Sequence, residues 1–154
     1  MTMPWKKILC PIDFSEPARA AMGTAAELCR QLDADLTLFH SYQLPGYTLP
    51  EGSVVASPKM LQELADQADT HLAEWRTLAQ QAGAPRVATA KSIGDPALEV
   101  VEFAREGGYD LIVLGTHGRT GLRHALLGSI TERVVRHARC PVLTIHPEPH
   151  RHGA

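Results

Sequence analysis

The sequence predicts an α/β protein: an open five-stranded parallel sheet with four helices packed on both of its faces. Short apolar segments alternate along the chain with longer amphipathic ones, as in sheets whose parallel strands are joined by crossover helices. The segment 111–114 is apolar at every position, which is typical of a strand that helices cover on both sides. The length of 154 residues is that of one domain. We expect this domain to span residues 1–146 and the tail 147–154 to be disordered.

The strands are predicted at the short apolar runs, and a capping residue marks the helix that follows the first of them. The predicted strands are at 7–12, 35–40, 86–90, 111–114 and 142–145. After the first strand, Ser15 is predicted to cap a helix and Pro17 lies in its first turn, where a missing N–H costs nothing. This helix carries a stripe of small apolar side chains, which favours close packing on the sheet.

The other three helices are predicted from similar signals. The second starts at Ser57 and Pro58 and ends at Gly83. The third starts at Asp95 and Pro96 and ends at 107–108. The fourth starts at 128–129, and its predicted inward positions are Ile130, Val134, Val135 and Ala138. Its arginines, Arg133, Arg136 and Arg139, are expected on a solvated face. The segment 42–57 has no periodicity and is predicted to be a functional or mobile loop.

Composition and charge exclude several classes of protein. The chain is 44% hydrophobic and 21% charged, and its formal net charge is −2. Because it has no overall positive field, we expect neither nucleic acid nor a membrane as its partner.

No apolar run reaches the roughly 18 residues of a membrane-spanning helix, and no secretory signal precedes the first strand, so we expect a cytoplasmic protein. The three cysteines are widely separated, which predicts buried thiols and no disulfide framework.

The segment that follows the strand at 111–114 is the main functional signal. Three glycines and a serine are spaced as Gly115-x-x-Gly118-x9-Gly128-Ser129. Glycine has no β-carbon, so it can adopt positive φ and let backbone N–H groups approach an anion closely. The spacing therefore predicts a cradle for phosphate.

This motif resembles the nucleotide-binding signature of the universal stress protein family, in its ATP-binding branch. Three further segments are similar to that family in the same order: 8–15, 94–96 and 139–143. The resemblance implies a Rossmann-like sheet of strand order 3-2-1-4-5, as in adenine nucleotide alpha hydrolases. It also implies ATP as the ligand, with Mg²⁺, and a homodimer formed through the last strand, Val142–Ile145, an apolar edge that a second copy would cover.

The residues that the resemblance assigns to the nucleotide lie at the ends of the first, second and fourth strands. They are Pro11, Ile12, Asp13, Ser41, Gly115, Thr116, His117, Gly118, Arg119, Gly128, Ser129 and Ile130. Asp13 would approach the ribose or a phosphate-bound Mg²⁺, and the alternative is that it only forms the turn before Ser15. His117 could act as a general base, although a loop histidine is more often a polar filler.

The sequence contains no G-x-x-x-x-G-K-[ST] loop and no G-x-G-x-x-G motif. Without the lysine of such a loop, slow turnover at best is expected, and we assign no catalytic residue. The first hypothesis is therefore a regulatory protein that binds ATP. The alternatives are a slow ATPase or adenine-nucleotide hydrolase, and a dimeric stress scaffold that binds no nucleotide.

Overall fold

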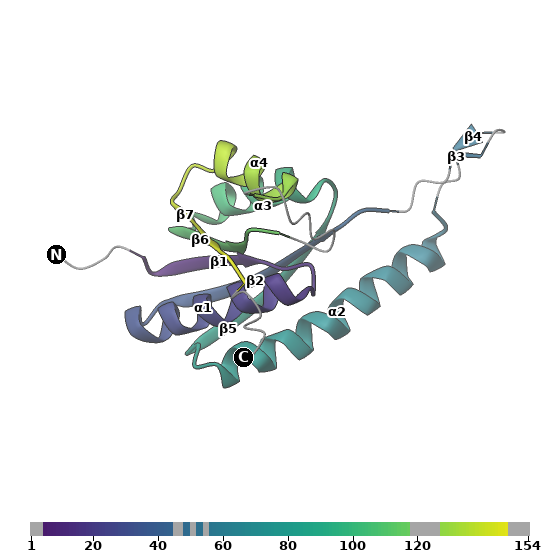
Figure 1. Ribbon diagram of the computed structural model, residues 1–154. Helices are drawn as coiled ribbons and strands as arrows, with labels where there is room; N and C mark the ends of the chain where they lie inside the picture. The colour runs from purple at the N-terminus through teal and green to yellow at the C-terminus, as the bar shows by residue number, and fades with distance from the viewer. Residues whose placement is uncertain (1–4, 45–47, 50–51, 54–55, 118–126, 148–154) are drawn as a thin grey trace, which may run out of the picture.

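A computed structural model describes residues 5–44, 48–49, 52–53, 56–117 and 127–147 (Figure 1). Its centre is a parallel sheet in the order β5-β2-β1-β6-β7. The strands are β1 (Lys7–Pro11), β2 (Asp35–Tyr42), β5 (Arg86–Ile93), β6 (Leu111–Gly115) and β7 (Val142–Ile145). Counted along the chain, these strands lie in the order 3-2-1-4-5, so the predicted fold class and strand order are confirmed. The tail at 148–154 lies outside the described residues.

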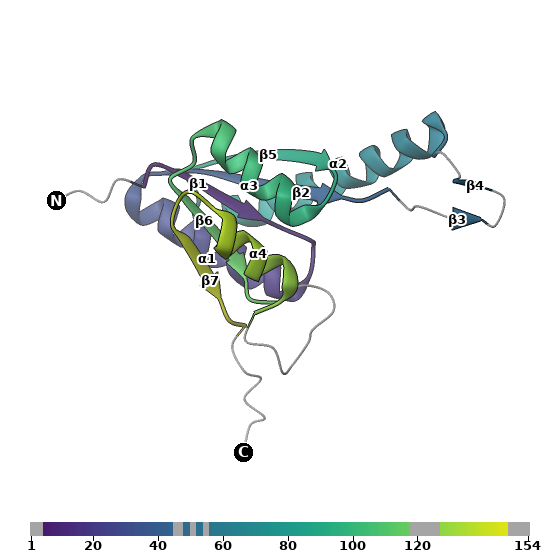
Figure 2. The ribbon, with the colours of Figure 1, turned by 90° about the horizontal axis from the view of Figure 1, so that it is seen from above.

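Two helices cover each face of the sheet (Figures 1 and 2). The helices are α1 (Glu16–Leu32), α2 (Pro58–Gln81), α3 (Pro96–Gly107) and α4 (Ser129–His137). Side chains alternate between the two faces along each strand. In β1, for example, Ile8 and Cys10 pack with α1 and α2, while Leu9 packs with α3 and α4. All three are fully buried, which explains why this strand is apolar without interruption.

The predicted helix starts are confirmed by side-chain caps. The Ser15 hydroxyl accepts a hydrogen bond from the Ala18 N–H, and Ser57 and Asp95 cap α2 and α3 in the same way. After α3, Gly108 has a φ of +65°, a left-handed conformation in which glycine is favoured. Helices α1, α2 and α3 therefore begin where local signals predict.

The structure differs from the predictions in three places. Strands β2 and β5 are longer than expected because they pair with each other over their full length, from Asp35↔Arg86 to Tyr42↔Ile93. The segment 42–57 contains a short hairpin, β3 (Thr48–Leu49) and β4 (Gly52–Ser53), which lies beside the start of α2 and away from the sheet (Figure 2). Two-residue strands leave no periodicity that a sequence could reveal.

The third difference concerns the orientation of α4. Ile130 and Val135 were predicted to face inward, and this is wrong, since 44% and 43% of their surfaces are exposed. The buried face is formed instead by Thr131 and Val134, three positions apart on the helix. Ile130 is thereby left at the rim of the cavity described below.

Candidate functional site: a cavity at the carboxyl edge of the sheet

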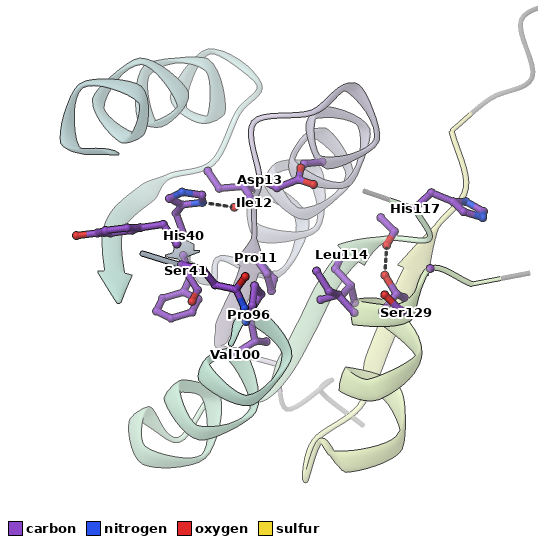
Figure 3. Close-up of a pocket in the computed structure, with 18 residues that line it drawn as sticks. Pro11, Ile12, Asp13, His40, Ser41, Pro96, Val100, Leu114, His117 and Ser129 are labelled. Atoms are coloured by element: carbon purple, nitrogen blue, oxygen red, sulfur yellow. Dashed lines mark hydrogen bonds between the residues drawn. The ribbon is translucent and has the colours of Figure 1, made fainter. Parts of the chain in front are cut away.

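A cavity of about 540 Å³ opens at the carboxyl edge of the sheet, between the ends of β1, β2 and β6 (Figure 3). Parallel α/β sheets bind ligands at this edge, where the connections from neighbouring strands diverge. Here the chain leaves β1 toward β2 on one side, while β6 leads to β7 on the other. The volume lies within the range of roughly 300–1,000 Å³ that small-molecule sites occupy.

Most of the residues that the sequence assigns to a nucleotide line this cavity. They are Pro11, Ile12, Asp13, Ser41, Gly115, His117, Gly128, Ser129 and Ile130. Thr116 does not line it, because its side chain is fully buried. Gly118 and Arg119 lie outside the described residues.

Sequence reasoning missed the apolar wall and one imidazole of the cavity. The additional lining residues include Phe39, His40, Pro96, Val100, Leu114 and Thr131. Several of them are apolar residues of helices and strands. In the sequence such residues cannot be distinguished from those of the core. His40 stands alone at the end of a strand, and a single histidine carries no motif.

The start of α4 forms the polar end of the cavity. The Gly128 N–H donates to the Thr116 carbonyl at 2.6 Å, and the Thr131 hydroxyl donates to the Gly115 carbonyl at 2.7 Å. These two bonds join the helix to the end of β6. The first N–H groups of a helix have no partner within it, and Gly128 has no side chain to cap them. This end therefore suits an anion, which the helix dipole also favours.

Gly115 has a different reason to be glycine from the one predicted. Among the described residues, the glycines with positive φ are Gly83, Gly94 and Gly108, so neither Gly115 nor Gly128 needs the left-handed conformation. A β-carbon on Gly115 would lie 3.0 Å from the carbonyl oxygen of Pro17. The glycine allows the first turn of α1 to approach the end of β6.

Asp13 lines the cavity and also forms the turn before α1. Its carboxylate accepts hydrogen bonds from the Ser15 N–H, at 3.1 Å, and from the Ser15 hydroxyl. Between them, Phe14 has a φ of +63°. A bulky residue in this left-handed region costs roughly 1–2 kcal/mol, so the turn is strained.

His40 supports the same turn from β2. Its Nδ1 lies 2.9 Å from the carbonyl oxygen of Ile12 (Figure 3). A carbonyl can only accept, so Nδ1 carries the hydrogen and donates it. The His40 ring also packs against that of Phe14, with 4.5 Å between the centroids. One imidazole thus contacts the residues on both sides of Asp13.

The imidazole of His117 points away from the centre of the cavity, toward the end of β7 (Figure 3). Its Nδ1 lies 3.1 Å from the Thr116 hydroxyl, and Nδ1 of His146 lies 3.3 Å from the same oxygen. In this geometry His117 is a partner of Thr116 and is not aimed at a ligand as a general base would be.

An ion pair joins α3 and α4, the two helices on one side of the cavity. Arg133 donates to both carboxylate oxygens of Asp95, at 2.9 and 2.8 Å. These bonds, together with the N–H of Leu98, lower the pKa of the Asp95 carboxyl below its usual value. Arg133 was predicted on a solvated face, and it is about half exposed, yet it also orients the two helices.

The charges around the cavity are few. Among the described lining residues, Asp13 is the one carboxylate, and none is lysine or arginine. The described part of the chain contains no group of three or more histidine, cysteine, aspartate or glutamate side chains that could hold a metal by themselves. A single carboxylate does fit Mg²⁺ that arrives with phosphates, since Mg²⁺ keeps several waters and takes one or two carboxylates.

The strand order defines a class, the doubly wound α/β proteins, and the cavity lies beyond the carboxyl ends of the strands, where proteins of this class bind small ligands. Residues 4–146 match the family model described as the universal stress protein family, and the chain belongs to this family. A universal stress protein of Methanocaldococcus jannaschii is 37% identical over 143 residues, which cover 92% of this chain and 82% of that protein.

Solved structures agree with this assignment. The universal stress protein UspA from Lactobacillus plantarum has a TM-score of 0.79 at 28% identity, and the match covers 93% of this chain and 99% of that one. A universal stress protein from Archaeoglobus fulgidus in complex with dAMP has a TM-score of 0.65, with 93% of this chain and 99% of that chain covered. At 23% identity, the second likeness is one of fold. The predicted family is therefore confirmed. No described helix is long and apolar enough to cross a membrane.

Proposed function

We propose that this universal stress protein binds ATP, with Mg²⁺, in the cavity at the carboxyl edge of the sheet, and that occupancy regulates its state or its partners. The observation that carries the proposal is the pairing of an apolar wall with a helix start in one cavity of about 540 Å³. A nucleotide has the same two parts, a flat apolar base and an anionic phosphate chain. The dAMP complex of a protein with this fold makes adenine nucleotides the first ligands to test.

In this proposal the base and ribose lie at the ends of β1 and β2, near Pro11, Ile12 and Ser41. The phosphates lie at the start of α4, near Gly128 and Ser129, with Gly118 and Arg119 of the motif as further candidates. Because no described lining residue is lysine or arginine, the positive charge at this end comes from the helix dipole and its N–H groups. Such a site is more tolerant of a metal-bound triphosphate than of a bare one.

Asp13 is the residue that would hold Mg²⁺, or the ribose hydroxyls, beside the phosphates. Mg²⁺ held there would neutralise part of the phosphate charge. The described residues offer no second carboxylate in the cavity, so affinity for Mg²⁺ without nucleotide should be weak. Regulation is favoured over rapid hydrolysis, because His117 is directed at Thr116 and not at the centre of the cavity.

The sharpest test of the phosphate position uses Ile130, which is half-exposed at the first turn of α4. Ile130→Asp places a negative charge where phosphate would lie, and Ile130→Asn is its neutral match. We expect the aspartate variant to bind ATP about tenfold more weakly than the asparagine variant, as for two like charges near a protein surface. High salt should reduce this difference.

Adenosine supplies a second control, because it lacks phosphate and should bind both variants equally. Val135→Asp adds the same charge at an exposed position of α4 that does not line the cavity, and it should leave ATP binding unchanged. Titration calorimetry with ATP, ADP, AMP and adenosine gives the comparison. Equal ATP affinity in the Ile130→Asp and Ile130→Asn variants would rule out phosphate at this helix start.

Mass analysis of ligand released from the purified protein, and of any ADP or AMP formed, identifies the natural nucleotide and tests for hydrolysis.

We also propose that the protein forms a homodimer through β7. This strand lies at one edge of the sheet, and all four of its residues are partly exposed in the single chain. An apolar edge with unpaired N–H and C=O groups is commonly covered by the same strand of a second copy across a two-fold axis.

A further inference from the structure

We propose that Phe14 is a positioning residue through which helix α2 sets the place of the Asp13 carboxylate. The inference deepens the proposed function, since it rests on Asp13 being the group that faces Mg²⁺ or ribose. Phe14 itself does not line the cavity, so its effect on a ligand is indirect.

The backbone of Phe14 is strained. Its φ of +63° lies in the left-handed region, which L-residues with a bulky side chain rarely adopt. Such a conformation persists only where the surroundings impose it. Here it turns the chain so that the Asp13 carboxylate faces back onto the N–H and hydroxyl of Ser15.

Neighbouring rings hold the side chain of Phe14. Three rings surround its side chain, with centroid distances of 4.5 Å to His40, 5.0 Å to His71 and 5.5 Å to Trp75. Trp75 is 9% exposed and meets the Phe14 ring edge-on, an arrangement that favours aromatic attraction. His71 and Trp75 both belong to α2, whereas His40 ends β2. The strained residue is therefore fixed by elements that are distant from it in the chain.

The ring cluster, formed by Phe14, His40, His71 and Trp75, acts on the backbone at both sides of the Asp13 carboxylate. His40 donates to the Ile12 carbonyl on one side of Asp13 and packs on Phe14 on the other. Ser15, which follows Phe14, donates its N–H and its hydroxyl to the Asp13 carboxylate, and the same hydroxyl accepts from the Ala18 N–H and caps α1. With the ring cluster in place, the backbone on both sides of Asp13 is held, and its carboxylate stays at the cavity wall.

Two substitutions at one position separate the strain from the packing. Phe14→Ala and Phe14→Gly lose the same ring contacts, but the left-handed conformation is unfavourable for alanine and readily adopted by glycine. We expect alanine to release the turn and glycine to keep it more often, although glycine is usually the more destabilising residue. Phe14→Tyr keeps the ring and should behave as the unchanged protein.

The readout without nucleotide is amide hydrogen exchange at Ser15 and Ala18, whose N–H groups are bound by the turn and by the cap. Exchange at these two sites should be about tenfold faster in Phe14→Ala and closer to normal in Phe14→Gly. Phe103→Ala removes an aromatic partner of Phe39 on the other face of the sheet and is the matched control. It should leave exchange at Ser15 and Ala18 unchanged.

The readout with nucleotide is the ratio of ATP affinities with and without Mg²⁺. Loss of a residue that orients a metal ligand should reduce this ratio about tenfold in Phe14→Ala. Phe14→Tyr should preserve the ratio, and Phe103→Ala should not change it. A general loss of stability would lower both affinities together and leave their ratio unchanged.

Normal exchange at Ser15 and Ala18 in Phe14→Ala would overturn the inference, as would equal effects of alanine and glycine. If Phe14→Ala does not fold, His71→Ala takes its place. This substitution removes one ring of the cluster at an exposed position, so the protein should still fold. Unchanged exchange in that variant would also overturn the inference. If the unaltered protein binds no ATP, the proposed function fails, and the exchange experiment still decides whether Phe14 holds the turn.

Discussion

Arg133, in the middle of α4, and Asp95, the cap of α3, form a two-pronged ion pair that joins two helices bordering the cavity. Asp95 also caps α3 through the Leu98 N–H. One carboxylate therefore caps α3 and holds α4 beside it. This relationship links the stability of the fold to the shape of the site.

Replacing Asp95 should affect stability in a pH-dependent way. Asp95→Ala removes the cap, which costs about 1 kcal/mol. Because Arg133 lowers the pKa of the folded Asp95 carboxyl, its contribution is present above the unfolded pKa of about 3.9 and is lost as the pH falls through the lowered value. The stability difference from the unaltered protein should be large at pH 7 and should shrink below about pH 4. Urea unfolding at several pH values measures it, and a difference independent of pH would contradict the assignment.

Gly115 should resist substitution for a reason unrelated to any ligand. Gly115→Ala would bring a β-carbon to 3.0 Å from the Pro17 carbonyl oxygen, which is backbone and cannot rotate away. We expect a loss of about 1–3 kcal/mol in unfolding free energy, as in other overpacked sites. Gly23→Ala is the matched control, because nothing lies within 4 Å of its new β-carbon in the middle of α1. It should stabilise the protein by roughly 0.5–1 kcal/mol. Thermal unfolding of both variants without nucleotide gives the comparison.

The proposed dimer predicts which residues of β7 are sensitive. Pro141 and Ile145 direct their carbonyls at β6, so by alternation Leu143 does as well, while Val142 and Thr144 direct their backbone groups outward. Thr144→Pro removes an outward N–H and should convert the dimer to a monomer that remains folded. Val142→Lys or Leu143→Lys should also weaken it, but both side chains pack on the core, so these variants lose stability too. Light scattering gives the mass, and an unchanged dimer in Thr144→Pro would exclude pairing through β7.

The cysteines should differ in reactivity. Burial raises the pKa of the Cys29 thiol to about 12, and burial also raises that of Cys10. Cys140 is only half-buried. Brief treatment of the native protein with iodoacetamide at pH 8 should modify Cys140 first and leave the other two intact, because the thiolate is the reactive form. Mass spectrometry of peptides detects the sites, and early labelling of Cys10 would contradict its burial in the core.

The sequence predicts those features of this protein that depend on neighbouring residues. Ser15, Ser57 and Asp95 each cap the helix expected, since a cap is a local hydrogen bond. The order of the strands came from the family resemblance, because spacing along the chain does not encode which strands are adjacent. The extra residues of β2 and β5 arise from their mutual pairing and have no local signal.

The candidate site was likewise predicted only where its residues form a local motif. The glycine motif indicates the end of β6 and the start of α4, and its described members line the cavity. The role of Gly115 depends on Pro17, far away in the chain, so the sequence suggested conformational freedom where the structure has a close contact. His40 and Phe14 act through rings contributed by α2 and β2, and only the assembled fold brings these together.

The buried hydroxyl of Thr116 has a consequence for the two imidazoles beside it. A hydroxyl has a single hydrogen, so it can donate to Nδ1 of His117 or of His146, but not to both. With both contacts formed, at least one ring must carry its own hydrogen on Nδ1. The tautomers of the two histidines are therefore linked: where Nδ1 of His117 accepts from the hydroxyl, Nδ1 of His146 must donate to it.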